Sequence, residues 1–210
     1  MNRKLINWLG LLGPISFISY IIAMEFAPMA YLNYDWMAQA VSDLSAQNSP
    51  SRILWDQLAT LYNIGSIVCI TLVCVYIEGR LSKRVRLGIY LFGWMNWVSA
   101  IGYSMFPLIS SGNSGGFQDM VHIYIVTPIV VLLSIISLGI LTYAGFKEKQ
   151  YRGLGRWALV ALLFMFAGAI GVGIVPPDYF GIPERFSVLA ATGFNAVLGV
   201  YLFNGFGIRE

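Results

Sequence analysis

Charged residues are scarce in this sequence: Asp, Glu, Lys and Arg make up 11% of its 210 residues, whereas hydrophobic residues make up 58%. A soluble domain of ordinary composition carries about a quarter charged residues. The composition therefore excludes a typical water-exposed surface and indicates an integral membrane protein. The net charge is only +3, and it gives no indication of a nucleic-acid partner.

The sequence also lacks the residues on which several membrane-protein chemistries depend. His122 is the only histidine, so two histidine ligands for a haem are absent, and no lysine lies within an apolar stretch to hold retinal. Cys69 and Cys74 lie five residues apart, where a helix directs them to different sides, and there is no Cys-x-x-Cys pair. We therefore expect no cofactor and no metal. A metal held by His122, Asp43 and Asp119 is the alternative, although one histidine with carboxylates is a weak zinc signature.

Six long apolar stretches make up most of the chain. A bilayer core about 30 Å thick takes roughly 20 helical residues to cross, and each stretch has about that length. We predict an all-α, polytopic membrane helix bundle that occupies residues 1–210 as a single domain. The first stretch is longer than a signal-peptide core and no small-residue cleavage site follows it, so we expect it to be retained. The predicted transmembrane helices cover residues 6–24, 57–77, 87–106, 120–145, 157–175 and 186–206.

Basic residues lie at alternate ends of these stretches. Eleven of the 13 fall on one side, and only Arg52 and Arg185 fall on the other. Because cytoplasmic loops carry the excess of Lys and Arg, we predict a cell-membrane protein with both termini in the cytoplasm. Seven of the ten acidic residues lie on the opposite, outer side. The basic residues of the predicted cytoplasmic side are Arg3, Lys4, Arg80, Lys83, Arg84, Arg86, Lys147, Lys149, Arg152, Arg156 and Arg209.

Residues 34–46, in the first predicted outer loop, have a helical pattern. Trp36 and Leu44 belong to its apolar face, while Ser42 and Asp43 fall largely opposite. Such a helix would lie in the membrane interface or fold back over the bundle. Either the acidic residues of this helix are solvated, or Ser42 and Asp43 point into an outer-facing cavity.

Asp119 and His122 open the fourth predicted helix, after a loop rich in Gly and Ser. Because they are three residues apart, they share one helix face. A histidine at a membrane entrance is either a hydrogen-bonded structural group or a functional one. In the second case, Asp119 would fix the tautomer of the imidazole and raise its basicity.

Glu184 and Arg185 open the last predicted helix, directly after a proline. A carboxylate in the first helical turn complements the helix dipole, which is a structural account of Glu184. Arg185 either binds a phosphate or carboxylate, or neutralises Asp43 or Glu184. Asn63 and Asn195 end a repeated Ala-Thr-x-aromatic-Asn pattern in the second and sixth stretches, and we expect both to face other helices.

Short motifs in these loops resemble those of a known membrane-protein family. Val41-Ser-Asp-Leu-Ser-Ala46 is similar to the Ile-Ser-Glu/Asp-Leu-Gly-Ala box in the first outer loop of the multi-pass family called domain of unknown function 998, with Ser45 where the family usually has Gly. The resemblance covers nearly the whole chain. Its further motifs are Gly102, Phe106-Pro107, His122 and Gly181-Ile-Pro-Glu-Arg185.

The resemblance implies a six-helix plan that is distantly similar to eukaryotic membrane proteins of lipid remodelling and lipid asymmetry. It also implies that the characteristic polar residues of the family fall at particular positions of this chain. These positions are Ser42, Asp43, His122, Glu184 and Arg185.

We predict an outer-facing polar pocket that binds or remodels a lipid or another amphipathic small molecule, with membrane lipids as partners. Asp43, His122 and Arg185 are expected to line one pocket beneath residues 34–46. The alternative is a lipid- or prenyl-active hydrolase or cyclase, in which Asp43 or Glu184 performs acid/base chemistry with His122. A proton or ion pump is less favoured, because the inner halves of the stretches carry no ionisable relay. The candidate substrate-binding residues are Ser42, Asp119, Arg185, Asn63 and Asn195.

Overall fold

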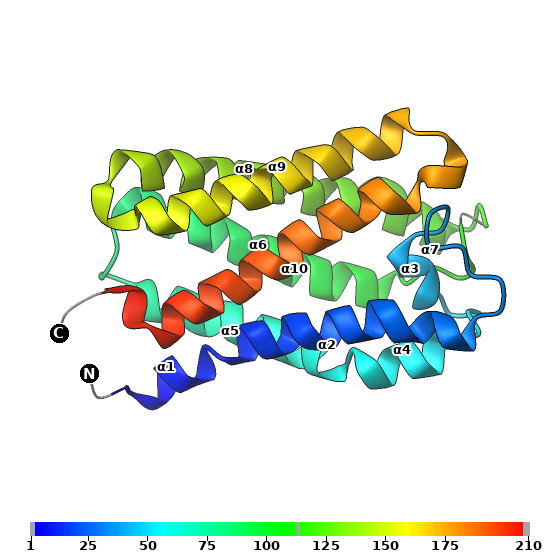
Figure 1. The fold of residues 1–210 in the computed structure, drawn as a ribbon, viewed down its shortest axis with the longest axis horizontal. Helices are drawn as coiled ribbons and strands as arrows, with labels where there is room; N and C mark the ends of the chain where they lie inside the picture. Colours follow the sequence, from blue (N-terminus) through cyan, green and yellow to red (C-terminus); the bar gives the residue numbers. More distant parts are fainter. Residues whose placement is uncertain (1–2, 113, 208–210) are drawn as a thin grey trace.

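The computed structural model describes residues 3–112 and 114–207, so that Arg209 of the predicted basic side lies outside the described residues. The described chain is a bundle of antiparallel helices without strands (Figure 1). Its α-helices are α1 (Leu5–Leu9), α2 (Leu12–Phe26), α3 (Val41–Leu44), α4 (Arg52–Leu58), α5 (Thr60–Ile77), α6 (Lys83–Met105), α7 (Phe117–Val121), α8 (Thr127–Lys147), α9 (Arg152–Ile174) and α10 (Gly181–Phe203). Short turns of other helix types are η1 (Ala27–Ala30), the π-helical η2 (His122–Val126), η3 (Lys149–Tyr151), η4 (Pro177–Tyr179) and η5 (Gly205–Gly207).

Five segments of the described chain are long and apolar enough to cross a membrane, and they confirm the prediction of an all-α membrane protein. These segments are Leu5–Ala30, Thr60–Ile77, Phe117–Lys147, Lys149–Ile174 and Pro177–Phe203. The remaining predicted span, residues 87–106, corresponds to α6, which is 23 residues long but less apolar, because Tyr90, Trp94, Asn96 and Trp97 lie in its middle.

The outer surface of the bundle is apolar. Ile64, Leu132 and Ile170 are each more than half exposed, although they are aliphatic. The interior is also apolar, and at its centre the rings of Phe92 and Phe194 meet edge to face at 5.0 Å. A bundle that is apolar on both its inside and its outside is typical of a protein surrounded by lipid.

The second predicted span breaks at a point where a neighbouring helix supplies a replacement contact. Between α4 and α5, the hydroxyl of Ser19 from α2 donates to the carbonyl of Leu58 at 2.5 Å and accepts from the backbone N–H of Tyr62 at 3.3 Å. Leu58 and Tyr62 are four residues apart and would bond to each other in an unbroken helix. The inserted serine therefore accounts for the break within the second predicted span.

Glycines allow α9 to touch one neighbour at each end. At one end, a methyl group added at Gly168 would lie 2.6 Å from the amide nitrogen of Ser187 in α10. At the other end, the backbone of α9 at Gly155 approaches the backbone of α8 at Gly145. As a result, α9 and α10 are close together at one end of the bundle and separate toward the other (Figure 1).

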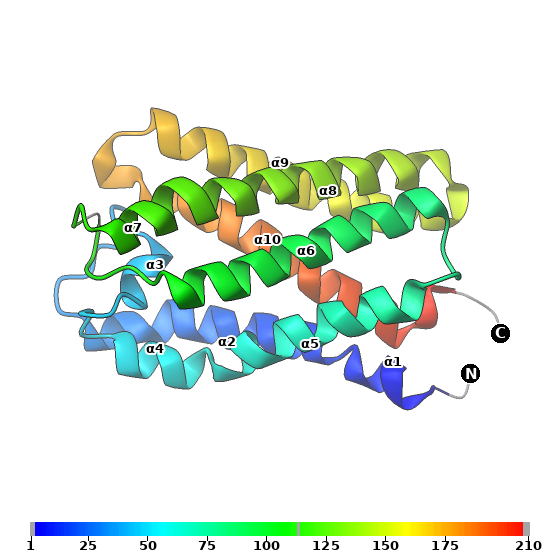
Figure 2. The ribbon, with the colours of Figure 1, turned by 180° about the vertical axis from the view of Figure 1, so that it is seen from behind.

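The two ends of the bundle differ in composition. Both described chain termini, the start of α6 and the turn between α8 and α9 lie at one end, which we call the terminal end (Figures 1 and 2). Lys83, Arg84 and Lys147 belong to these segments. The opposite end, which we call the cap end, holds α3, α7 and the loops around them. Basic residues therefore gather at the terminal end, as the charge pattern predicts.

Candidate functional site

The first loop of the cap end is mostly not helical. The predicted helix over residues 34–46 is wrong except for α3, and Trp36 of its predicted apolar face is 53% exposed. The carboxylate of Asp35 accepts from the backbone N–H of Met37 at 2.9 Å, and Gln39 Oε1 accepts from the backbone N–H of Asp35 at 2.8 Å. Such side-chain bonds to nearby backbone compete with helical hydrogen bonds, and this explains the turns.

Asp43 joins the first loop to the second. Its side chain lies in α3 and is buried, with 5% of the residue exposed. One carboxylate oxygen accepts from the backbone N–H of Ala40 at 3.0 Å, and the other accepts from the backbone N–H of Gly112 at 2.9 Å. The backbone N–H of Gln47 adds a second link by donating to the carbonyl of Leu108 at 2.8 Å. The loops are thus bonded to each other rather than separated by a cavity at this point.

Asp119 organises the second loop from inside. The residue is 0% exposed, and its carboxylate accepts from the backbone N–H of Ile109 at 2.8 Å and that of Ser114 at 2.9 Å. The hydroxyl of Ser114 also donates to it. A buried carboxylate with several donors is stabilised as the anion, so Asp119 has a structural explanation within this loop.

Arg185 fastens the first loop to the start of α10. Its Nη1 donates to the carbonyl of Gln39 at 3.0 Å and to that of Gly181 at 2.9 Å, while Nη2 donates to the hydroxyl of Tyr34 at 2.7 Å. The guanidinium also lies 5.9 Å from the centre of the Trp36 ring. Arg185 therefore bonds to backbone carbonyls and a tyrosine in the described chain, rather than to the neighbouring carboxylates.

Glu184 contributes a further link between the same segments. One oxygen of its carboxylate accepts from the backbone N–H of Val41 at 3.2 Å, at the start of α3. Glu184 also lies in the first turn of α10, which confirms the predicted placement near a helix N-terminus. The carboxylate of this residue thus faces the N-terminal turns of two helices.

Tyr34 is a hydrogen-bonded partner of Arg185 that no sequence motif indicates. Its hydroxyl accepts from Arg185 and donates to the carbonyl of Ala40 at 3.0 Å. Burial raises the pKa of Tyr34 to about 12, and the guanidinium of Arg185 opposes this shift. The phenol therefore remains neutral and able to donate at physiological pH.

His122 is oriented by a backbone carbonyl. Its Nδ1 lies 2.8 Å from the carbonyl oxygen of Phe106, and because a carbonyl can only accept, Nδ1 carries the proton. The ring packs 4.6 Å from the ring of Tyr103. The prediction that Asp119 fixes the tautomer is wrong, since the Asp119 carboxylate accepts from Ile109 and Ser114 instead.

The backbone at His122 departs from a regular α-helix. η2 is one turn of π-helix, in which the carbonyl of His122 accepts from the backbone N–H of Thr127, and the hydroxyl of Thr127 donates to the same carbonyl at 2.9 Å. A π-helical turn within an α-helix is often found at functional sites. The irregular backbone places His122 beside the second loop of the cap end.

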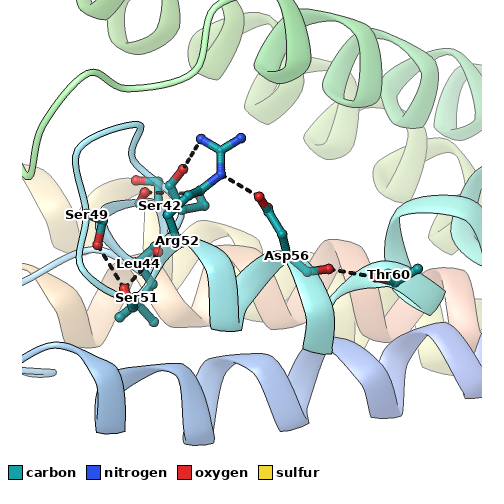
Figure 3. A network of polar contacts seen from close by, with 8 residues as sticks. Ser42, Leu44, Ser49, Ser51, Arg52, Asp56 and Thr60 are labelled. Carbon is teal, nitrogen blue, oxygen red and sulfur yellow. Dashed lines mark hydrogen bonds and ion pairs between the residues drawn. The ribbon is translucent and has the colours of Figure 1, made fainter.

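Arg52, the other basic residue at the cap end, holds the first loop to α4 (Figure 3). Its Nε donates to the carboxylate of Asp56 at 2.7 Å, and its Nη1 donates to the carbonyl of Ser45 at 3.1 Å. The hydroxyl of Ser51 donates to the carbonyl of Leu44 at 2.9 Å. These bonds fix the chain as it leaves α3 and enters α4.

Three predicted binding residues lie apart from one another. Ser42 contributes its carbonyl, which accepts from the backbone N–H of Ser45 at 3.2 Å. Asn195 faces another helix as expected, because its Nδ2 donates to the carbonyl of Ser66 in α5 at 3.1 Å. The same expectation is wrong for Asn63, which is exposed on α5.

The motifs that resemble a known family converge in this cap. Gly102 and Phe106 border the turn that carries His122, and the motif from Gly181 to Arg185 bonds to the loop around α3. A family model described as "Protein of unknown function (DUF998)" matches residues 11–201. The chain belongs to this family. No curated protein and no solved structure matches the chain.

The structure explains why DUF998 motif positions are small. A methyl group at Gly102 would lie 2.7 Å from a methyl carbon of Val126, and one at Gly181 would collide with the carbonyls of Trp36 and Gln39. Ser45, which stands where the resemblance implies a glycine, has φ −102° and ψ 1°. That conformation is open to any residue, so the serine is accommodated without strain.

Two grooves of this DUF998 protein lie away from the cap. One is a groove of about 490 Å³ between α2, α9 and α10, and the other is a groove of about 470 Å³ between α5 and α6. Neither is lined by Asp43, His122 or Arg185. The three residues share one end of the bundle, but the polar pocket expected between them stays a prediction. Among the described residues, no group of three or more His, Cys, Asp or Glu could hold a metal ion.

Proposed function

We propose that this protein is a six-span protein of the cell membrane, with cytoplasmic termini, that binds or remodels a lipid or another amphipathic molecule without changing it covalently. The cap end, at which the loops bond to one another, then faces outward. Three observations support this proposal: the length of α6, the bonding of the cap carboxylates and the position of the grooves.

The sixth crossing is supported by the geometry of α6. Its 23 residues give a length of about 34 Å, which exceeds the roughly 30 Å of a bilayer core. It packs against α5 and α8, two of the apolar helices. The charged residues of α6 are Lys83, Arg84 and Arg86, all in its first turn, and the remainder carries no charge. A helix of this kind crosses the membrane with its neighbours and places its basic start in the cytoplasm.

The bonding of the carboxylates carries the non-catalytic part of the proposal. Asp43 and Asp119 each accept from backbone N–H groups of the cap loops through both carboxylate oxygens, and Glu184 accepts through one oxygen from the backbone N–H at the start of α3. A general acid or base has to reach the substrate with the oxygen that exchanges its proton. Oxygens that hold two loops together would have to break those bonds first. We therefore assign Asp43, Asp119, Glu184 and Arg185 to closing the outer end of the bundle.

The apolar grooves support binding of an amphipathic molecule. Both open between helices, in the part of the bundle that would face lipid chains, and their walls are almost entirely apolar. Sites for apolar ligands have this character, with few polar groups to fix orientation. A lipid chain can therefore enter from the side without opening the cap.

Lipid retention and turnover together test the proposal. The protein is extracted with its surrounding membrane in polymer nanodiscs, and its lipids are compared by mass spectrometry with those of the whole membrane before and after long incubation. We expect enrichment of particular lipids and no change in their covalent structure. A lipid profile equal to that of the membrane would refute specific binding.

The alternative, a lipid- or prenyl-active hydrolase or cyclase, is favoured by one observation. With the proton of His122 on Nδ1, the neutral ring keeps a lone pair on Nε2 that could act as a base. A new lipid product that forms with the wild type and not with His122→Gln would establish this alternative.

A further inference from the structure

The groove between α9 and α10 is a wedge that opens toward the terminal end. The helices touch at the cap end, where Gly171 packs on Pro183, and they separate toward the other end (Figure 1). Phe17 of α2 forms the floor beside Gly193, which has no side chain to fill the space. The groove extends along α10 from Leu189 to Tyr201.

The dimensions of this wedge match one lipid chain in one leaflet. Leu189 and Tyr201 are 12 residues apart in a continuous helix, which corresponds to a length of about 18 Å. One leaflet of the hydrocarbon core is about 15 Å thick. Near the wide end lie Trp157 and Tyr201, which are aromatic residues with polar groups suited to the membrane interface.

The face of α9 that lines the groove continues into two arginines. Arg152, Arg156 and Val160 are spaced four residues apart and therefore lie on one face, and Val160 lines the groove. Both arginines are exposed, and neither forms an ion pair with an acidic residue among those that the structure describes. Arg156 directly precedes Trp157, which lines the groove, and the hydroxyl of Tyr201 approaches Gly153, the residue after Arg152. Two unneutralised guanidinium groups on the part of α9 that borders the wide end complement a negatively charged headgroup above an acyl chain.

We infer that this groove binds one acyl chain of an anionic phospholipid from the cytoplasmic leaflet, with Arg152 and Arg156 at its phosphate. The inference rests on the proposed membrane orientation and names the lipid class that the protein selects. Arginine suits this role because its planar fork can donate two hydrogen bonds to phosphate oxygens. A zwitterionic lipid of the same chain length fits the apolar groove equally well but gains less from the two arginines.

Quenching of Trp157 by brominated lipids tests the inference. The protein is reconstituted into vesicles that contain equal amounts of phosphatidylglycerol and phosphatidylcholine, with bromine on the chains of one lipid or of the other. The contribution of Trp157 is obtained by subtracting the signal of Trp157→Phe. We expect phosphatidylglycerol to quench Trp157 more strongly, with a preference of about fivefold or more, since each basic residue near anionic lipid strengthens binding by roughly that factor.

One double variant and a matched control test the role of the arginines. The double change Arg152→Gln and Arg156→Gln should reduce the preference to about one while Trp157 remains quenched by either lipid. The control, Lys83→Gln with Arg84→Gln, removes two exposed charges at the same end on α6 and should keep the preference.

The possible outcomes separate this inference from the proposed function. An equal preference in the wild type and in the arginine variant would overturn the inference, even when nanodiscs retain specific lipids. A loss of preference in the control variant as large as in the arginine variant would show general surface attraction and would also overturn it. If nanodiscs retain no specific lipid at all, the proposed function itself fails. Gly193→Leu, which fills the groove, should lower quenching by both lipids, and unchanged quenching would place the lipid elsewhere.

Discussion

Replacing Asp43 with asparagine should open the joint between the two cap loops. The carboxylate accepts from Ala40 through one oxygen and from Gly112 through the other. Asparagine keeps one oxygen and turns its NH₂ group toward the second N–H, so one bond is lost and two donors face each other. A hydrogen bond to a charged group contributes about 1.5–3 kcal/mol, and the opposed donors add to this. We expect the joint to lose about 2–4 kcal/mol of stability.

Hydrogen exchange measures this loss at the amides concerned. Because about 1.4 kcal/mol corresponds to a factor of ten, exchange of the Gly112 amide should become roughly 30- to 700-fold faster. Mass spectrometry of peptides from the second loop, with the protein in nanodiscs, resolves such a change. Peptides from the centre of α8 should keep their protection, since that helix does not contact the joint.

Asp35→Asn is the matched control, because it makes the same chemical change in the same loop. Asp35 is exposed, and its carboxylate caps Met37 within its own turn. We expect less than about 1 kcal/mol from this change, because water can replace the lost bond. Equal exchange of Gly112 in the two variants would refute the assignment of Asp43 as the joint between the loops.

Three further predictions concern other features of the bundle. Gly181→Ala should destabilise the protein by about 1–3 kcal/mol in thermal unfolding, because the added methyl group collides with two loop carbonyls. Gly173→Ala, whose added methyl group meets open space, should be neutral or stabilising. The reverse order of stability would contradict the packing at Gly181. The phenol of Tyr34 should ionise near pH 12 rather than 10, so its contribution to stability is complete below about pH 10 and is lost as the pH rises through 12. The absorbance difference between wild type and Tyr34→Phe measures this ionisation. A midpoint at pH 10 would exclude the burial of the Tyr34 phenol. Impermeant thiol reagents applied to intact cells should label a cysteine introduced at Asn113 and not one at Lys149, and the opposite result would invert the proposed orientation.

Much of the candidate site could be located from the sequence, because only a few polar residues interrupt the apolar stretches. Asp43, Asp119, Glu184 and Arg185 all belong to the cap, on the side opposite most basic residues. Their partners could not be predicted. The acceptors and donors are mostly backbone groups, and every residue carries these, so the sequence has no signal that marks Gly112 or any other as the partner.

By itself, the sequence determined that this protein is helical and suited to a membrane. Long apolar stretches leave helices as the structure that satisfies the backbone without water, and this constraint acts within each stretch. Tertiary structure decided what depends on contacts between distant segments. Ser19 breaks the helix near Leu58, the first loop folds into turns instead of the predicted helix, and the Phe106 carbonyl orients His122. The divergence of α9 from α10 also depends on tertiary structure. Glycines let two backbones touch only where the partner helix is close, and the position of the partner helix is set by the packing of the whole bundle.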